Sequence, residues 1–276
     1  MPALLIVPSS LKFKSHYMKT SSVLLVVVFI IQLSACKKDV IPNTTSDLTL
    51  PQNLTANNLS PKARCSVIDP SNFVSQITNP YFPLAPGTVF RYVNRIIDGD
   101  DTSYEHIEVS VASDTKIIEG VKCQVVHDVV KEEGEVTEDT YDWYAQDKNG
   151  NVWYFGEHSK SLKDKNGWTT EGSWEAGEHN ACAGIIMFAN PQAHAGEIYN
   201  QEFLPGIAED QAQVINSNST VSVPYGTFTN CVKTKEFTIL EPGVIEYKYY
   251  AAGVGLLKTE MIAGGNELEV LTSVIH

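Results

Sequence analysis

Apolar and polar residues alternate with a period of two through most of the chain after residue 70. Ile107, Val109 and Val111 alternate with polar neighbours, and the stretch from Val121 to Val129 alternates in the same way. This period is typical of strands in an antiparallel sheet with one buried face. We therefore expect Val125, His127 and Val129 to point into a core, with His127 as a core histidine.

Turn signals separate these runs at short intervals. Asn149-Gly150 lies between YDWYAQ and NVWYFG, which is a strong hairpin signal. Only one short helix is expected, near Pro70–Gln76, with Asp69 or Ser71 as its cap. About a dozen strand candidates at this spacing predict an all-β fold, a large antiparallel curved sheet or half-open barrel.

The start of the chain has a different pattern. From Met18, a basic residue, Lys19, precedes an apolar run from Val23 to Ile31, and small residues follow. This layout is typical of a secretory signal peptide, and the run is shorter than the roughly 20 residues of a spanning helix. Residues 1–35 are therefore predicted to be a signal peptide, with Met18 as an alternative start.

The run ends in Leu33-Ser34-Ala35-Cys36, which resembles the lipobox of bacterial lipoproteins. The resemblance implies cleavage before Cys36 and acylation of that residue, with diacylglycerol on its sulfur and a fatty acyl group such as palmitate on its new amino terminus. Each buried methylene would contribute about 0.8 kcal/mol to membrane binding. The absence of Asp directly after Cys36 resembles lipoproteins released to the outer membrane, and the Lys37-Lys38-Asp39 start resembles the surface-export signals of some lipoproteins. The periplasmic or exterior side stays open. An ordinary signal peptide with an incidental cysteine is the alternative.

Residues 37–69 are rich in Asn, Thr, Ser and Pro and show no sustained period. A coil of this length reaches roughly 30 Å. We predict a lipid anchor and flexible tether over residues 36–69 and a single β-rich domain over residues 70–276.

Composition and charge exclude several classes of protein and one class of partner. Hydrophobic residues make up 43% and charged residues 19% of 276 residues, which excludes a disordered chain, a coiled coil and a polytopic membrane protein. The formal net charge is -13 and becomes -16 once residues 1–35, which hold three lysines and no acid, are removed. Such a surface repels phosphate backbones, so no nucleic-acid partner is predicted.

The cysteines and histidines form no metal or redox motif, because CxxC and HExxH spacings are absent. Secretion permits disulfides, and four cysteines allow three pairings, between which the sequence does not choose. A disulfide between Cys123 and Cys231 is disfavoured, because Cys123 alternates in step with valines and Cys231 in step with polar residues. Free thiols are an equal alternative to any disulfide. The four residues are Cys65, Cys123, Cys182 and Cys231.

No nucleophile elbow or phosphate loop occurs, so no catalytic motif is present. Acidic residues nevertheless cluster around Trp174 and again near residues 202–210. Two carboxylates could hydrolyse a glycosidic bond, and grouped carboxylates could hold Ca²⁺. A solvated acidic rim is the alternative. The catalytic candidates are Glu175, Glu202, Glu209 and Asp210, and the last three are also the calcium candidates; no other cofactor is predicted.

Aromatic residues are concentrated in a few strands and could line an apolar or sugar-stacking pocket on the concave side of the sheet. Core packing is the alternative. The pocket-lining candidates are Tyr141, Trp143, Trp153, Trp174, Tyr247 and Tyr249.

Several segments resemble an uncharacterised family of secreted bacterial β-rich lipoproteins. They are NPYFPLAPGTVFRY, DWYAQDKNGNVWYFGE, GSWEAG, QEFLPGIAEDQAQV, VSVPYGTFTNCVKTKE and LEPGVIEYKYYAAGVGLLKTE, which together span roughly residues 79–260. The resemblance implies secretion and a β-rich domain, and it implies no activity or ligand. The FPLxxGTxFxY opening is also similar, at the level of architecture, to periplasmic carrier-type lipoproteins.

These observations favour a lipid-anchored, non-catalytic β-domain of the cell envelope that binds a small, partly apolar ligand or an envelope protein. The first alternative is a secreted hydrolase that uses the clustered carboxylates. The second is a structural or adhesive surface protein, which an exposed aromatic patch would favour.

Overall fold

The computed structural model describes residues 65–163 and 167–276. Cys36, the predicted signal peptide and most of the predicted tether lie outside the described residues. Within them, fifteen strands belong to one sheet. The strands are β1 (Val89–Asp98), β2 (Asp101–Ile118), β3 (Val121–Glu132), β4 (Glu135–Gln146), β5 (Val152–Leu162), β6 (Trp168–Thr169), β7 (Trp174–Glu175), β8 (Cys182–Met187), β9 (Ile198–Asn200), β10 (Glu202–Phe203), β11 (Asp210–Val223), β12 (Gly226–Thr238), β13 (Ile245–Ala251), β14 (Gly255–Ala263) and β15 (Glu267–Ile275).

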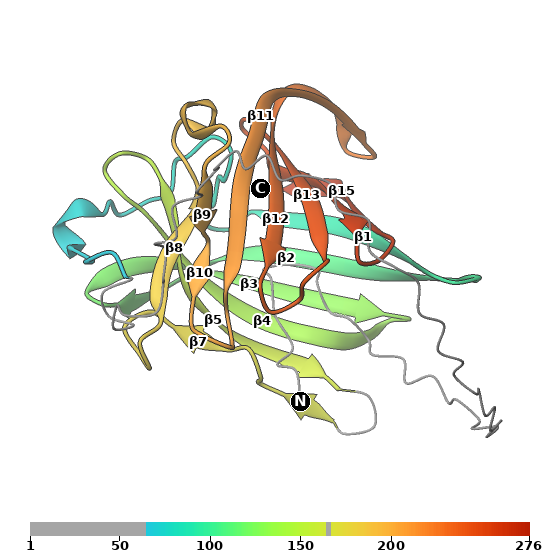
Figure 1. Ribbon diagram of the computed structural model, residues 1–276, viewed down its shortest axis with the longest axis horizontal. Coiled ribbons are helices and arrows are strands. Elements are labelled where there is room, and N and C mark those ends of the chain that lie inside the picture. The colour runs from blue at the N-terminus through green and yellow to red at the C-terminus, as the bar shows by residue number, and fades with distance from the viewer. Residues whose placement is uncertain (1–64, 164–166) are drawn as a thin grey trace, which may run out of the picture. The chain divides into compact units, whose positions relative to one another are not determined.

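The sheet curves into a nearly closed antiparallel barrel, which confirms the predicted fold class (Figure 1). Strands β1 to β5 pair in sequence, as do β11 to β15, and β1 pairs with β15. The order ends in β10 on one side and β9 on the other, yet only Gln201 separates these two strands in the chain. Because β9 pairs with β11 and β10 pairs with β8, one short segment connects both edges of the sheet.

Tight turns connect the long strands. Glu119 and Gly120, and likewise Glu133 and Gly134, all have positive φ, which is the backbone that a two-residue hairpin turn requires. The hairpin predicted at Asn149-Gly150 is confirmed, since it joins β4 to β5.

The predicted short helix is present but shorter than expected. It is a 3₁₀ helix, η2 (Pro70–Asn72), and the Asp69 carboxylate accepts a hydrogen bond from the Ser71 N–H at its start. It stops there because Phe73 forms a β-bridge with Asp147. A second 3₁₀ helix, η4 (Pro191–His194), precedes β9. In the described part of the chain, no helix has the length and apolar character to cross a bilayer.

One apolar cluster fills the barrel, and one disulfide ties the start of the domain to it. Among the most deeply buried side chains are Ile107, Tyr154 and Phe155. A disulfide joins Cys65 to Cys182 at the start of β8. The remaining cysteines of the described residues, Cys123 and Cys231, are buried free thiols.

The face that β3 turns to the core differs from the prediction. Val126, Asp128 and Val130 are buried, whereas His127 is half-exposed and hydrogen-bonds Asp139 at 2.8 Å. Pairing with β4 runs without a break from Gln124 to Val130, so Val125, His127 and Val129 share the face that carries Tyr141 and Trp143. The opposite face, with Val126 and Asp128, is the one that faces the cavity inside the barrel. The expectation that His127 is a core residue was therefore wrong.

Candidate ligand-binding site

An open cleft of about 740 Å³ lies where β2, β4, β5 and β7 meet the loop that follows β10. Its volume falls within the range of about 300–1,000 Å³ that is usual for small-molecule sites. The lining residues are Lys116, Tyr141, Trp143, Glu157, His158, Ser173, Trp174, Glu175, Glu178, His179, Leu204 and Ile207.

The position of β7 beside β5 builds one wall of the cleft. In this pairing Gly156 stands opposite Glu175, and Glu157 stands opposite Trp174. Gly156 has a φ of 131°, and a Cβ at this position would lie 2.3 Å from the carbonyl oxygen of Trp174. Only glycine allows the two backbones to come this close.

Lys116, Trp143 and Glu175 form a connected group in the cleft. The Lys116 ammonium lies 2.5 Å from a Glu175 carboxylate oxygen and 3.4 Å from the centre of the Trp143 ring. The three residues come from β2, β4 and β7, so this group connects three strands. A cation over an aromatic face is held by both the ring and its acidic partner.

Tyr141 gives the cleft an accessible aromatic surface. Its side chain is 40% exposed, and its ring stacks on that of His127 with centroids 4.2 Å apart. The hydrogen bond between His127 and Asp139 fixes the histidine ring beneath it. Ile207 adds an exposed apolar side chain to the same lining.

Glu157 is the buried polar group of the cleft, with only 1% exposure. The Tyr154 hydroxyl lies 3.1 Å from its Oε2 atom, whereas Oε1 has no hydrogen-bond partner within the protein. Burial is the largest cause that raises the pKa of Glu157, and the nearby charges of Asp142 and Glu202 raise it further. Its strand partner Asp142 faces the inner cavity, so the Glu157 carboxyl lies on the barrel side of β5, behind the wall of the cleft.

Glu157 belongs to a larger set of acids inside the sheet. Nine acidic side chains are buried on strands in the described residues, against one buried lysine, Lys248. Burial raises the pKa of Asp142 and of Asp210 to about 7 and that of Glu246 to about 8. The acids are Asp128, Glu138, Asp142, Glu157, Glu202, Asp210, Glu236, Glu246 and Glu269.

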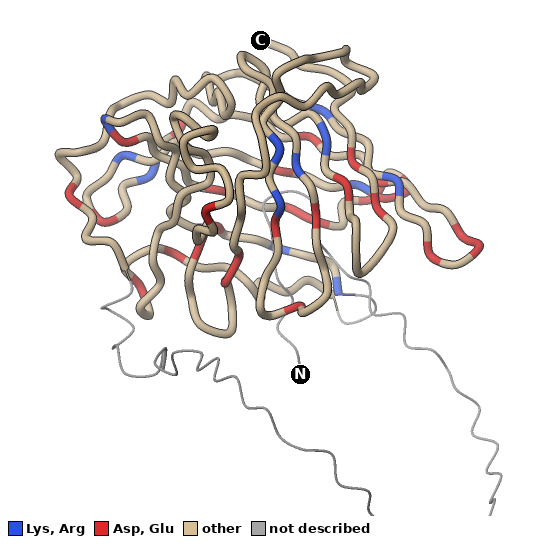
Figure 2. Tube along the Cα trace, turned by 45° about the horizontal axis from the view of Figure 1, so that its top comes forward, with Lys and Arg blue, Asp and Glu red and all other residues tan. Residues whose placement is uncertain are grey.

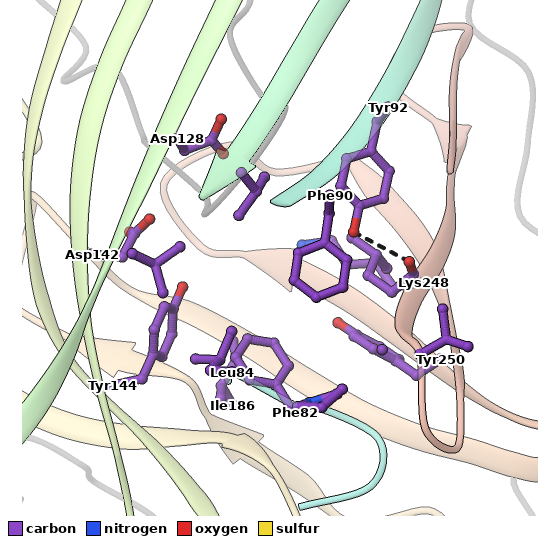
Figure 3. A pocket seen from close by; sticks show the side chains of 16 residues that line it. Phe82, Leu84, Phe90, Tyr92, Asp128, Asp142, Tyr144, Ile186, Lys248 and Tyr250 are labelled. Atoms are coloured by element: carbon purple, nitrogen blue, oxygen red, sulfur yellow. Dashed lines mark hydrogen bonds between the residues drawn. The ribbon is translucent and has the colours of Figure 1, made fainter. Parts of the chain in front are cut away.

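Figure 3 shows a smaller cavity, of about 70 Å³, inside the barrel. Asp128 and Asp142 face it from one wall and Lys248 from the opposite one, while Phe82 and Ile186 lie on its apolar side. Its volume has room for a few water molecules and is well below the range of ligand pockets. The open cleft is therefore the better candidate site.

Comparison with known proteins gives two solved structures that match part of this chain. Neither a known protein family nor a curated protein matches the chain. One structure is a "putative exported protein with YmcC-like fold" from Bacteroides fragilis NCTC 9343, with a TM-score of 0.42, 14% identity, and coverage of 71% of this chain and 99% of that chain. The other is a "putative lipoprotein" from Parabacteroides distasonis ATCC 8503, with a TM-score of 0.35, 13% identity and the same coverage of 71% and 99%.

The four acids singled out in the sequence do not form one group. Glu175 lines the cleft, whereas Glu202 and Asp210 are buried inside the barrel, close enough for the Asp210 charge to raise the pKa of Glu202. Glu209 is half-buried and accepts a hydrogen bond from the Gly206 N–H within its own turn. In residues 65–163 and 167–276, no three histidine, cysteine or acidic side chains are grouped as metal ligands. The calcium site at Glu202, Glu209 and Asp210 stays a prediction.

The predicted aromatic lining is divided among three places. Tyr141, Trp143 and Trp174 line the cleft. Trp153 lies elsewhere and donates its indole N–H to Asp147 at 3.0 Å. Tyr247 and Tyr249 contact lysines on the opposite face of β13 from the buried Lys248.

Sequence reasoning missed Lys116, Glu157 and His158. Lys116 lies on a different hairpin from Glu175, so nothing local relates the two residues. Gly156 interrupts the alternation of β5, and this interruption was the one local sign that the neighbouring Glu157 changes face.

Proposed function

We propose that this protein is a lipid-anchored, non-catalytic domain of the bacterial cell envelope that binds a small, partly apolar ligand in the open cleft. The observation that supports this most directly is the open cleft of about 740 Å³, in which the Tyr141 side chain is 40% exposed. Polar side chains, among them Lys116, His158 and Glu175, stand in the same lining and would bind the polar groups of a ligand.

The aromatic side of the cleft favours a ligand with a flat apolar face. Tyr141 presents its ring to solvent over a fixed histidine, and Ile207 adds apolar contact. A sugar ring combines such a face with hydroxyl donors, so a short oligosaccharide is the ligand class that fits the lining best.

A panel of neutral and acidic oligosaccharides, screened by thermal shift and followed by calorimetry, tests this function. A ligand should raise the melting temperature, and Tyr141→Ala should weaken its binding at least fivefold, since an aromatic contact contributes about 1 kcal/mol. Tyr104→Ala removes a comparably exposed tyrosine outside the cleft and should leave binding unchanged. Absence of any binder in the panel, or equal loss in both variants, would contradict the proposal.

A hydrolase remains the second candidate because two carboxyls line the same cleft. They are Glu175, which pairs with Lys116, and Glu178 in the loop after β7. To distinguish the two functions, oligosaccharide cleavage by the unaltered chain and by Glu175→Gln is monitored by chromatography. Cleavage that this variant abolishes would establish a hydrolase, whereas binding without cleavage in the unaltered chain supports the non-catalytic function.

A further inference from the structure

The outer face of β12, β13 and β14 carries a regular set of lysines and tyrosines. Lys235 pairs across to Tyr247, and Lys233 pairs across to Tyr249. Tyr249 in turn stands opposite Lys258 on β14. Because direct partners on antiparallel strands lie on the same face, these five residues form one surface, the basic-aromatic face.

Aromatic rings hold the lysines of this face in place. The Lys233 ammonium lies 3.5 Å from the centre of the Tyr247 ring, and the Lys258 ammonium lies 4.3 Å from that of Tyr249. Glu260 forms an ion pair with Lys258 at 3.0 Å. It stands opposite Tyr247 and is therefore an acid on the same face. Leu268 on β15 stands opposite Glu260 on one side and Arg95 on the other, so Arg95 belongs to the same face. The cations of this face therefore outnumber the acid.

This charge is opposite to that of the whole protein, which carries a net charge of -13. Figure 2 shows several blue segments close together on neighbouring strands right of centre, whereas the hairpin tip at the far right is red. At physiological salt, charges more than about 8 Å apart are largely screened. The local surplus of lysine therefore governs what this face attracts.

We infer that the basic-aromatic face docks onto the phosphate headgroups of an anionic lipid bilayer. Its charge is complementary to that surface, and a sheet face with lysines in rows can meet many headgroups at once. If Cys36 is acylated, the predicted tether would keep the domain within roughly 30 Å of the bilayer, which raises the effective concentration of this face at the membrane. The inference is independent of the ligand proposed for the cleft.

Vesicle co-sedimentation of the chain with Cys36→Ser, which cannot be acylated at that residue, tests this inference. The protein should bind vesicles of phosphatidylcholine mixed with phosphatidylglycerol, should not bind phosphatidylcholine alone, and should dissociate as salt is raised. Lys233→Gln combined with Lys235→Gln should weaken binding by about fivefold per lysine. The matched control, Lys122→Gln combined with Lys160→Gln, removes two exposed lysines from other strands and should have little effect.

Circular dichroism melts must show that both double variants fold like the unaltered chain, and Lys258→Gln provides an independent third position if one does not. Three results would overturn the inference. They are no binding to anionic vesicles, equal binding to neutral vesicles, and equal loss in the control. Binding to polyglutamate but not to vesicles would assign the face to an acidic protein instead.

Discussion

Asp142 and Glu157 stand directly opposite each other on β4 and β5, and the Tyr154 hydroxyl lies 2.7 Å from one carboxyl and 3.1 Å from the other. Burial raises the pKa of both acids, that of Asp142 to about 7, and the Asp142 charge adds to the effect on Glu157. Inside the barrel, both acids therefore keep their protons to a higher pH than an exposed carboxyl does.

The stability of the domain should fall as pH rises from about 5 to 9. In the unfolded chain these acids titrate near 3.8 or 4.5, whereas the folded values are about 7 for Asp142 and Asp210 and about 8 for Glu246. The folded state thus binds more protons across this window, and each pH unit there lowers the free energy of unfolding by up to about 1.4 kcal/mol per group. Thermal melts across the window measure the slope.

Asp142→Asn, which keeps the shape of the side chain and cannot ionise, should flatten this profile. Glu135→Gln changes an exposed carboxylate at the start of the same strand and should leave the slope as it is. A profile that is flat or rises with pH in the unaltered protein would contradict the interpretation.

Replacing Lys248 should be strongly destabilising. Its ammonium lies 2.9 Å from the Glu236 carboxylate, and both side chains are almost completely buried. Lys248→Met leaves the acid without its cation, and removal of one partner of a buried ion pair costs about 3–5 kcal/mol. Urea unfolding measures the loss. Adding Glu236→Gln to this variant should recover part of it, and no recovery would mean that the lysine acts through packing alone.

Gly156→Ala should loosen β7 from β5 and disrupt the cleft. The new Cβ would collide with the Trp174 carbonyl oxygen, and the φ of 131° is itself unfavourable for alanine. Gly87→Ala is the matched control, because Gly87 has a φ of 92° and no atom within 4 Å of the added Cβ. Thermal melts should show a much larger loss for Gly156→Ala, and equal losses would exclude the steric cause.

Loss of the Cys65–Cys182 disulfide should lower stability by about 2–5 kcal/mol, since it closes a loop across 117 residues. The comparison is between the unaltered chain and Cys65→Ser in thermal melts without reductant. Cys123→Ser, at a buried free thiol, keeps the disulfide and should show a smaller loss and the same response to reductant as the unaltered chain, whereas Cys65→Ser should not respond. A melting temperature that does not respond to reductant in the unaltered chain would argue against this pairing.

Mass spectrometry of the membrane fraction should find a mature chain that begins at an acylated Cys36. Cys36→Ser should release the protein from that fraction while leaving the domain folded. A mature start at another residue, or an unmodified Cys36 thiol in the native protein, would remove the basis for a lipid anchor.

The sequence predicted the β-class well because its signals are local. Alternation along Ile107–Val111 and the Asn149-Gly150 turn each depend on adjacent residues, and both are confirmed. The site was predicted only in part. Tyr141, Trp143 and Glu175 do line the cleft, but Glu202 and Asp210 lie inside the barrel because β10 and β11 turn them inward.

By itself, the sequence determined that the chain folds as antiparallel strands joined by glycine turns. Tertiary structure decided the rest: that Asp128 rather than His127 faces the core, that Cys65 meets Cys182, and that Lys116 meets Glu175. The physical reason is that alternation along a strand defines two faces but not which of them lies against the core. That choice, and the contacts between distant strands, are set by the packing of the whole barrel.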